Sequence, residues 1–308
     1  MTEHTEIAID SGQTAIKVRL GQEEIPSFPG LRANSSVLPQ LAAVVGRVAK
    51  HAGSKSFRVL IGTCGLTKHD NDPVELLRLC EPYGVESVVL AHDAVTSFLG
   101  AVGDRPGVVV AAGTGAITLG VGVETIARVD GWGNVIGDAG GGYWIGRESL
   151  DAVLRAYDGR GPATSLTTVV QRRFLDLESA YIELQTDGDW VRTVASFAQE
   201  VASLADRDAV AAAICEEAGQ HLAHSAVTAA KRIGEASQLN PVISLVGGIL
   251  SSGAVRDSCV AALQARWPSF IPFPAKGSAL DGAKALWELK PTHPLSGQVT
   301  QAARSRGG

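Results

Sequence analysis

The chain has 308 residues, of which 45% are hydrophobic and 19% charged, and its formal net charge is −5. This composition indicates a globular protein long enough for two domains, and it argues against a nucleic-acid binder that depends on phosphate neutralisation. The longest apolar runs are too short to cross a membrane, and the opening MTEHTEIAID has no signal-peptide pattern.

Strand and helix patterns alternate through the first third of the chain. Residues 7–9 and 15–20 are predicted strands joined by a turn at residues 11–14, which together predict a hairpin. Apolar spacing then predicts, in order, helix 37–52, strand 58–62, helix 73–80, strand 85–90 and helix 93–102. This alternation is typical of parallel strands joined by helical crossovers, so the expected fold class is α/β.

The pattern then starts again, with predicted strands at residues 108–112 and 116–121 around the turn Gly113-Thr114-Gly115. Gly113 holds a place like that of Gly12, so the chain reads as two related halves. The later elements are helices within residues 148–234, a buried strand 242–246 ending at Gly247-Gly248, and helices 253–267 and 280–289.

This order of elements predicts three regions. We expect an N-terminal lobe over residues 1–104, a C-terminal lobe over residues 105–290, and a loose polar tail over residues 291–308. The last helix, 280–289, is a candidate to pack back on the N-terminal lobe.

The four cysteines lie far apart and form no CxxC motif. A zinc site is therefore not expected, and scattered thiols are typical of reduced core residues in a cytoplasmic protein. They are Cys64, Cys80, Cys215 and Cys259.

The two glycine turns suggest a phosphate site. A tight hairpin turn directs backbone N–H groups and a Thr hydroxyl toward one point, and such concavities bind phosphate oxygens. Asp10, just before the first turn, is placed to hold Mg²⁺, and Lys17 on the returning strand adds positive charge. Two alternatives stay open: Asp10 as a turn-capping carboxylate, and Lys17 as an ordinary exposed lysine.

A glycine-dense stretch, RVDGWGNVIGDAGGGYWIGRESL, covers residues 128–150. Dense glycine is entropically costly, and a common reason for it is a backbone that passes close to a ligand. The Asp138 carboxylate suits a polar substrate held by charge-assisted hydrogen bonds. A flexible surface loop is the alternative, although Trp132, Ile136 and Trp144 are poor residues for a solvated linker.

Asp93 is the candidate catalytic base. It follows strand 85–90 and begins a helix, which places it at the carboxyl end of a strand, where open α/β sheets bind ligands. The helix N-terminus stabilises its ionised form, and a carboxylate there can accept a proton from a hydroxyl. The alternative is that Asp93 only caps the helix. We take the neighbouring His92 as a local hydrogen-bonding residue rather than a second base.

Several motifs resemble those of a known superfamily. DSGQTAIKVRL and GTGAITLGV resemble the first and second phosphate motifs of the actin/hexokinase/Hsp70 superfamily, LVGGILSS its adenosine motif, and HDAVTSFLGA the segment with its catalytic Asp. GWGNVIGDAGGGYWIGRESL resembles the BadF/BadG/BcrA/BcrD ATPase group, in particular its N-acetylglucosamine kinase branch.

The resemblance implies two ribonuclease-H-like, actin-like ATPase lobes with ATP and a sugar in the cleft between them. It implies an ATP- and Mg²⁺-dependent kinase of an amino sugar, N-acetylglucosamine or glucosamine at the 6-hydroxyl, acting as a cytoplasmic homodimer. Asp93 would be the general base, and Asp10 would serve the metal. The sugar would contact Asn34, Asp93, Trp132, Gly133 and Asp138, and ATP would contact Gly12, Gln13, Thr14, Lys17, Gly113, Thr114, Gly115, Gly247 and Gly248.

The sequence departs from the branch at four positions. Ala139 and Gly141 stand where the branch commonly has Glu and Ser, His92 replaces an Asn, and Gln13 stands where Gly is common. These changes leave the sugar open among N-acetylglucosamine, glucosamine, N-acetylmannosamine, muramic-acid derivatives and glucose. Two other functions stay open: a non-catalytic sugar sensor, and an ATPase activator of a dehydratase, which would need closely spaced cysteines for an iron–sulfur cluster.

Overall fold

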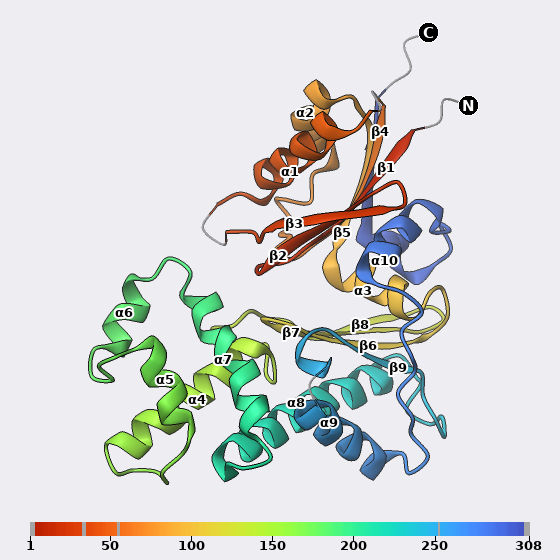
Figure 1. Ribbon diagram of the computed structural model, residues 1–308. Helices are drawn as coiled ribbons and strands as arrows, with labels where there is room; N and C mark the ends of the chain where they lie inside the picture. The colour runs from red at the N-terminus through yellow and green to blue at the C-terminus, as the bar shows by residue number, and fades with distance from the viewer. Residues whose placement is uncertain (1–3, 33–34, 54–55, 252, 305–308) are drawn as a thin grey trace. The chain divides into compact units, whose positions relative to one another are not determined.

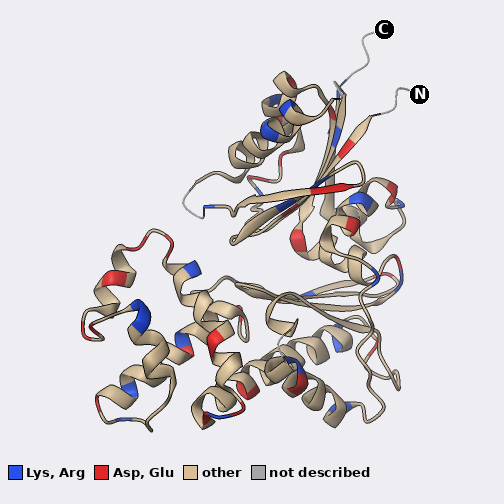
Figure 2. Cartoon of the chain, viewed as in Figure 1, with Lys and Arg blue, Asp and Glu red and all other residues tan. Residues whose placement is uncertain are grey.

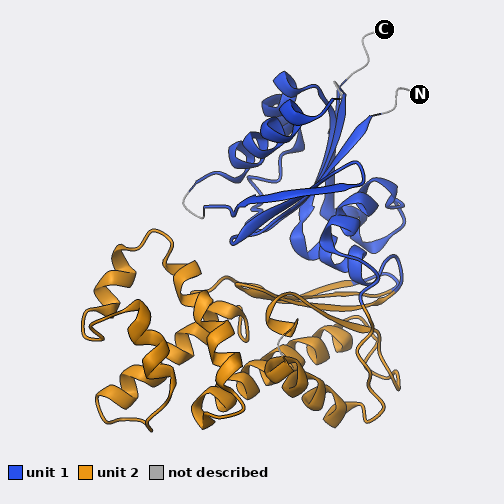
Figure 3. Cartoon of the chain, viewed as in Figure 1, with its two compact units in different colours: residues 1–105, 123–125, 275–308 blue, residues 106–122, 126–274 orange. Residues whose placement is uncertain are grey.

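Two compact units make up the computed structural model, which describes residues 4–32, 35–53, 56–251 and 253–304 (Figure 1). Unit 1 comprises Met1–Arg105, Val123–Thr125 and Ala275–Gly308, and unit 2 comprises Pro106–Gly122 and Ile126–Pro274 (Figure 3). This division differs from the expected one at its C-terminal end, because Ala275–Gly308 belongs to unit 1 and includes the last predicted helix, the candidate to pack back on the N-terminal lobe.

Unit 1 is built on a six-stranded sheet in the order β10-β5-β4-β1-β2-β3. β1, β4 and β5 are parallel, and β2, β3 and β10 are antiparallel to their neighbours. The strands are β1 (Thr5–Ser11), β2 (Ala15–Leu20), β3 (Glu23–Pro29), β4 (Phe57–Thr63), β5 (Val85–His92) and β10 (Val299–Ala303). The β1–β2 hairpin and the parallel pairing of β4 and β5 agree with the sequence analysis.

The two outer strands of this sheet were not predicted. β3 has two prolines and is mostly exposed, as an edge strand tolerates. β10 pairs with β5, about 200 residues earlier in the chain, in a register that joins Thr300 to Leu90. The expectation of a loose tail was therefore wrong for residues 294–303, which form a 3₁₀ turn (Pro294–Gln298) and β10.

Helices cover both faces of the unit 1 sheet (Figure 1). α1 (Val37–His51) and α2 (Pro73–Cys80) bury Leu38, Leu41, Val45 and Leu76 against the β1 and β4 side chains. On the other face α3 (Asp93–Ala101) packs against α10 (Ala279–Ala285). Their backbones lie so close that a Cβ on Gly282 would be 1.7 Å from the Thr96 carbonyl oxygen.

An ion pair connects α10 to the first hairpin. Arg19 on β2 donates to Asp281 Oδ1 over 2.6 Å, and Asp281 also completes a capping box with Ser278 at the start of α10. The hydrogen bond from Arg19 and those from Ser278 lower the pKa of Asp281 to about 2.

We expect Asp281→Ala to lower the free energy of unfolding by about 1 kcal/mol, as for a typical lost helix cap. Because the pKa of Asp281 is depressed from 3.8, its contribution is present above pH 4 and is lost as the pH falls toward 2. Urea unfolding of both proteins at pH 7 and near pH 3 measures this. An equal difference at the two pH values would contradict the role of the charged carboxylate.

Unit 2 has a four-stranded sheet in the order β8-β7-β6-β9. β6 and β9 are parallel, and β7 and β8 are antiparallel to their neighbours. The strands are β6 (Gly107–Ala112), β7 (Ala116–Val121), β8 (Ile126–Asp130) and β9 (Ile243–Val246). β8, short and half-exposed at the edge, was not predicted.

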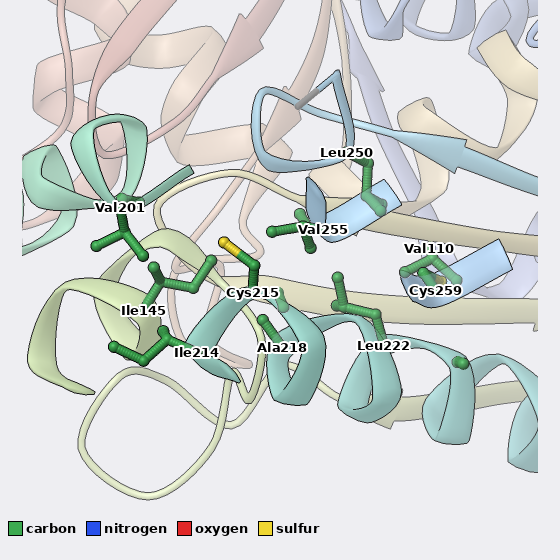
Figure 4. Close-up of a cluster of buried hydrophobic side chains, with 14 of the residues drawn as sticks. Val110, Ile145, Val201, Ile214, Cys215, Ala218, Leu222, Leu250, Val255 and Cys259 are labelled. Carbon is green, nitrogen blue, oxygen red and sulfur yellow. The ribbon is translucent and has the colours of Figure 1, made fainter. Parts of the chain in front are cut away.

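Six helices of unit 2 enclose its main core. They are α4 (Gly142–Tyr157), α5 (Leu166–Arg173), α6 (Ala180–Thr186), α7 (Trp190–Leu204), α8 (Ala209–Arg232) and α9 (Gly253–Arg266). α8 packs on the sheet, and its Ala218 and Leu222 lie in one apolar cluster with Val110 (Figure 4). Cys215 and Cys259 belong to this cluster, and burial raises their pKa values to about 11 and 12, so both thiols are neutral core groups.

Charged residues of both signs are scattered over both units (Figure 2). Within the described residues, no helix is long and apolar enough to cross a membrane.

Candidate functional site

The carboxyl ends of the parallel strands meet at one edge of the unit 1 sheet. The register places Asp10 of β1 beside Gly62 of β4, and Thr63 of β4 beside His92 of β5. Asp93 follows as the first residue of α3. Asp10 and Asp93 therefore gather at this edge, and the strand pattern had predicted the place of Asp93.

The predicted first phosphate turn is a braced hairpin turn. Gly12 N–H donates to the Ala15 carbonyl over 3.1 Å, and Leu31 N–H donates to the Gly12 carbonyl over 3.0 Å. Gly30 lies against this turn, since a Cβ there would be 2.0 Å from the Gln13 carbonyl oxygen. Gln13, Thr14 and Lys17 are exposed on the turn and its returning strand. Asn34, the predicted sugar contact in this unit, lies outside the described residues.

The surroundings of Asp10 disfavour its ionised carboxylate, which a bound cation would stabilise. Burial raises the pKa of Asp10, the Lys17 charge opposes this, and the Asp93 charge raises the pKa further. Among the described residues, no group of three or more His, Cys, Asp and Glu could hold a metal by itself. A single carboxylate fits Mg²⁺ that keeps nucleotide phosphates and water as its other ligands.

We expect Asp10→Asn to abolish activity and yet to raise the melting temperature at pH 7. A raised pKa means that the folded state disfavours the ionised carboxylate, and the amide removes that cost. The gain should shrink as the pH falls through the folded pKa, because Asp10 then becomes protonated. Thermal unfolding across a pH series measures this, with Asp104→Asn as the matched control. A melting temperature below that of the native chain at pH 7 would contradict it.

His92, not Asp93, is the N-cap of α3. Ala94 N–H lies 3.2 Å from His92 Nδ1, and the same nitrogen is 2.7 Å from Asp93 Oδ1. The alternative that Asp93 serves only as the helix cap is therefore not supported. Thr96, fully buried, donates to the Asp93 carbonyl over 3.0 Å and fills the space above Gly62, where a Cβ would be 2.1 Å from its Oγ1.

Cys64 is a further residue of this edge that the sequence analysis did not assign to the site. Its backbone N–H donates to the Ser11 carbonyl over 2.9 Å. Burial, with the charges of Asp93 and Asp10, raises the pKa of the Cys64 thiol to about 12, so the thiol stays neutral. The available signal was its position directly after a strand of the same parallel set.

In unit 2 the predicted second phosphate turn is tied to the start of α4. Gly113 N–H donates to the Gly115 carbonyl, while Gly142 and Tyr143 donate to the Gly113 and Thr114 carbonyls, all over 2.8 Å. Gly113 is exposed and a Cβ there would meet nothing within 4 Å, whereas a Cβ on Gly115 would be 2.1 Å from Asp138 Oδ2.

The adenosine-motif glycines lie beside this turn. β9 pairs with β6 in a register that joins Val246 to Ala111, so Gly247 and Gly113 follow neighbouring strand ends. Gly247 has φ +100°, and a Cβ there would be 2.2 Å from the Ala112 carbonyl oxygen. Gly248 is exposed in open space.

Two aspartates frame the glycine-rich loop. Asp138 accepts from Gly133 N–H over 2.9 Å, and Asp130 accepts from the N–H groups of Asp138 and Ala139 over 2.8 and 2.9 Å. Both aspartates have positive φ, 56° for Asp130 and 59° for Asp138, which is uncommon outside glycine. Asp130 was missed by the sequence analysis, although Asp before Gly is a recognised turn signal.

The Asp138 carboxylate joins the loop to the phosphate turn. Burial raises its pKa, and hydrogen bonds from the Gly133 and Ala116 backbone oppose that rise. Gly141 is confined at the same junction, because a Cβ there would be 2.6 Å from Gly115 C. The Ser that the resembling branch carries at this position would therefore not fit without a backbone shift.

The loop presents apolar side chains to solvent. Trp132 is 61% exposed, and Val135 and Ile136 are more exposed still. The Arg128 guanidinium lies 4.5 Å from the Trp132 ring centroid and holds the indole from one side. A pocket of about 330 Å³ elsewhere in unit 2, lined by Asp151, Arg155 and Arg160 among others, contains none of the predicted site residues.

Curated relatives of this chain include two amino-sugar kinases. It is 29% identical over 201 residues to an N-acetylmuramic acid/N-acetylglucosamine kinase of Clostridium acetobutylicum, covering 63% of this chain and 64% of that protein. It is 46% identical over 81 residues to an N-acetyl-D-glucosamine kinase of Dictyostelium discoideum, covering 26% and 25%. The chain thus matches less than two thirds of the length of either relative.

Solved structures share the fold. A candidate N-acetylglucosamine kinase of Chromobacterium violaceum superposes with a TM-score of 0.66 at 23% identity, covering 91% of this chain and 97% of that one. A ROK hexokinase of Thermus thermophilus gives a TM-score of 0.52 at 16% identity, covering 91% and 96%. The predicted two-lobed α/β fold is confirmed by these likenesses. The model of the BadF/BadG/BcrA/BcrD ATPase family matches residues 7–268, so the chain belongs to that family.

Proposed function

We propose that this chain transfers the γ-phosphoryl group of ATP to a hydroxyl of an amino sugar, N-acetylglucosamine or glucosamine at the 6-hydroxyl. The observation that carries the proposal is the pair of carboxylates, Asp10 and Asp93, at the carboxyl edge of the unit 1 sheet beside a braced glycine turn. The names of the curated relatives support the sugar class.

Asp93 is the proposed general base. Its carboxylate accepts the proton of the sugar hydroxyl as that oxygen forms a bond to the γ-phosphorus. The bond from the γ-phosphorus to the bridging oxygen breaks, and ADP leaves with that oxygen. Phosphoryl transfer requires mainly positioning and neutralisation of charge, so a single well-placed carboxylate is sufficient for the protein's part in proton transfer.

The proposed ATP contacts are residues of the two glycine turns and of the adenosine motif. Backbone N–H groups and hydroxyls at Gly12-Gln13-Thr14 and Gly113-Thr114-Gly115 bind phosphate oxygens, Lys17 adds charge, and Gly247-Gly248 let the nucleoside approach the backbone. Asp10 would hold Mg²⁺, which when bound neutralises charge on the phosphates.

The proposed sugar contacts lie on the glycine-rich loop. The exposed ring of Trp132 offers an apolar face, and Gly133 beside it leaves the backbone accessible. Asp138 accepts backbone hydrogen bonds, but a carboxylate has about four acceptor positions, so it retains capacity for a sugar hydroxyl. Asn34 completes the proposed set, and the homodimer and the cytoplasmic location stay predictions.

Coupled ADP release tests the proposal. Purified protein is assayed with Mg·ATP against N-acetylglucosamine, glucosamine, N-acetylmannosamine, N-acetylmuramic acid and glucose. We expect one amino sugar to stimulate ADP release strongly over the sugar-free rate. Sugar binding by calorimetry without stimulated release would instead indicate a sensor, and Ala139→Glu would then be the reversion to make.

A further inference from the structure

The carboxylate of Asp93 has a close polar neighbour. Its Oδ1 is buried, and His92 Nδ1 lies 2.7 Å from it. The two atoms are within hydrogen-bond distance, although Oδ1 makes no hydrogen bond of regular geometry among the described residues.

A proton between these two atoms accounts for the short distance. An unprotonated Nδ1 and an ionised Oδ1 would bring two lone pairs together at 2.7 Å, which is repulsive. The same Nδ1 faces Ala94 N–H at 3.2 Å, but one ring nitrogen cannot accept from Ala94 and donate to Asp93 at once. The longer contact is the weaker one, so donation to Asp93 is the favoured arrangement.

The surroundings favour this donor. Asp10 of β1 and the neutral Cys64 thiol after β4 interact with Asp93 at the same edge, and the Lys17 charge on β2 opposes the rise in the pKa of Asp10. Two carboxylates of like charge in a partly buried site favour a proton donor beside one of them. His92 is half-buried, with 31% of its side chain exposed, so its ring is held by its surroundings at this position.

We propose that His92 is a positioning residue for Asp93: its Nδ1–H binds Oδ1 and leaves Oδ2 free to accept the proton of the sugar hydroxyl. The catalytic consequence of this contact rests on the proposed function, whereas the contact itself does not. The contact assigns to His92 the orientation of the base.

Ring-nitrogen NMR of histidine-labelled protein tests the geometry without any turnover. The His92 signal is identified by its loss in His92→Asn. We expect a protonated Nδ1 in the native chain, and in Asp93→Ala a shift to the tautomer with a bare Nδ1 that accepts from Ala94 N–H. A bare Nδ1 in the native chain would overturn the inference even if the kinase assay succeeds, and a failed kinase assay would leave this readout intact.

Kinetics then tests the consequence. His92→Ala is expected to lower kcat by about 10–100-fold, as for a misplaced catalytic group, with little change in the KM for ATP. His92→Asn, whose amide can donate to Asp93, should recover most of that loss. Asp72→Ala is the matched control, because it removes the N-cap of α2, which accepts from Val74 and Glu75 N–H over 3.0 Å, and should lower stability but not kcat. Native kcat in His92→Ala, or equal losses in His92→Ala and His92→Asn, would contradict the positioning role.

Discussion

Asp93→Asn is expected to lower kcat for sugar phosphorylation by about 10²–10⁴-fold, the usual range for loss of a general base. The amide keeps the shape of the carboxylate but cannot accept the hydroxyl proton. The N-cap of α3 is His92, so the helix should keep its start. Sugar affinity should change far less than kcat, because the base acts mainly in the transition state.

Coupled ADP release with the preferred sugar measures this loss, and calorimetry with the sugar alone measures binding. Asp104→Asn is the matched control, since Asp104 follows α3 at its far end and belongs to none of the proposed contacts. Turnover in Asp93→Asn close to that of the native chain would remove Asp93 from the mechanism. An equal loss of kcat in Asp104→Asn would show that the assay responds to the removal of a charge from unit 1 and not to the loss of the general base.

Gly113→Ala is expected to raise the KM for ATP by about tenfold or more without lowering the melting temperature. A Cβ at Gly113 meets nothing within 4 Å, so the free protein accommodates it. The added methyl group occupies the space above the turn where the phosphates are proposed to bind, and a displacement near 1 Å is costly in such sites.

Substitutions at two further glycines serve as controls for this result. Gly188→Ala, also in unit 2 with open space at its Cβ position, should change neither KM nor stability. Gly115→Ala should destabilise unit 2 by about 1–3 kcal/mol, since its Cβ would be 2.1 Å from Asp138 Oδ2. Initial rates over a range of ATP concentrations, with thermal unfolding of each variant, separate the three cases. An unchanged KM in Gly113→Ala would exclude this turn from the phosphate site.

Much of the fold and of the unit 1 site could be predicted from local patterns in the sequence. Alternating buried strands and helices predicted parallel β1, β4 and β5, and parallel strands bring their carboxyl ends to one edge. The rule predicted the place of Asp93, and the structure shows Asp10 at the same edge. The glycine turns at Gly12 and Gly113 were also predictable from local sequence, because a tight turn depends on residues that are adjacent in the chain.

Other features are decided by contacts between distant segments. β10 pairs with β5 across about 200 residues, and α10 returns to unit 1 because Gly100 and Gly282 allow its backbone to approach α3. No local pattern encodes such pairings. The amphipathic period sets which face of an element is apolar, but not which partner covers it.

The side-chain networks of the site also needed the tertiary structure. Composition indicated a ligand loop around Asp138, but the cross-loop bonds of Asp130 and Asp138 depend on two aspartates held at positive φ. Likewise, His92 and Asp93 are adjacent in the sequence, yet only the packing of α3 against the sheet turns the ring nitrogen toward the carboxylate. The sequence by itself determined which residues are candidates for the site and at which strand ends they lie. The tertiary structure decided which polar atoms meet. Hydrogen-bond geometry depends on ångström-scale placement, which no spacing rule specifies.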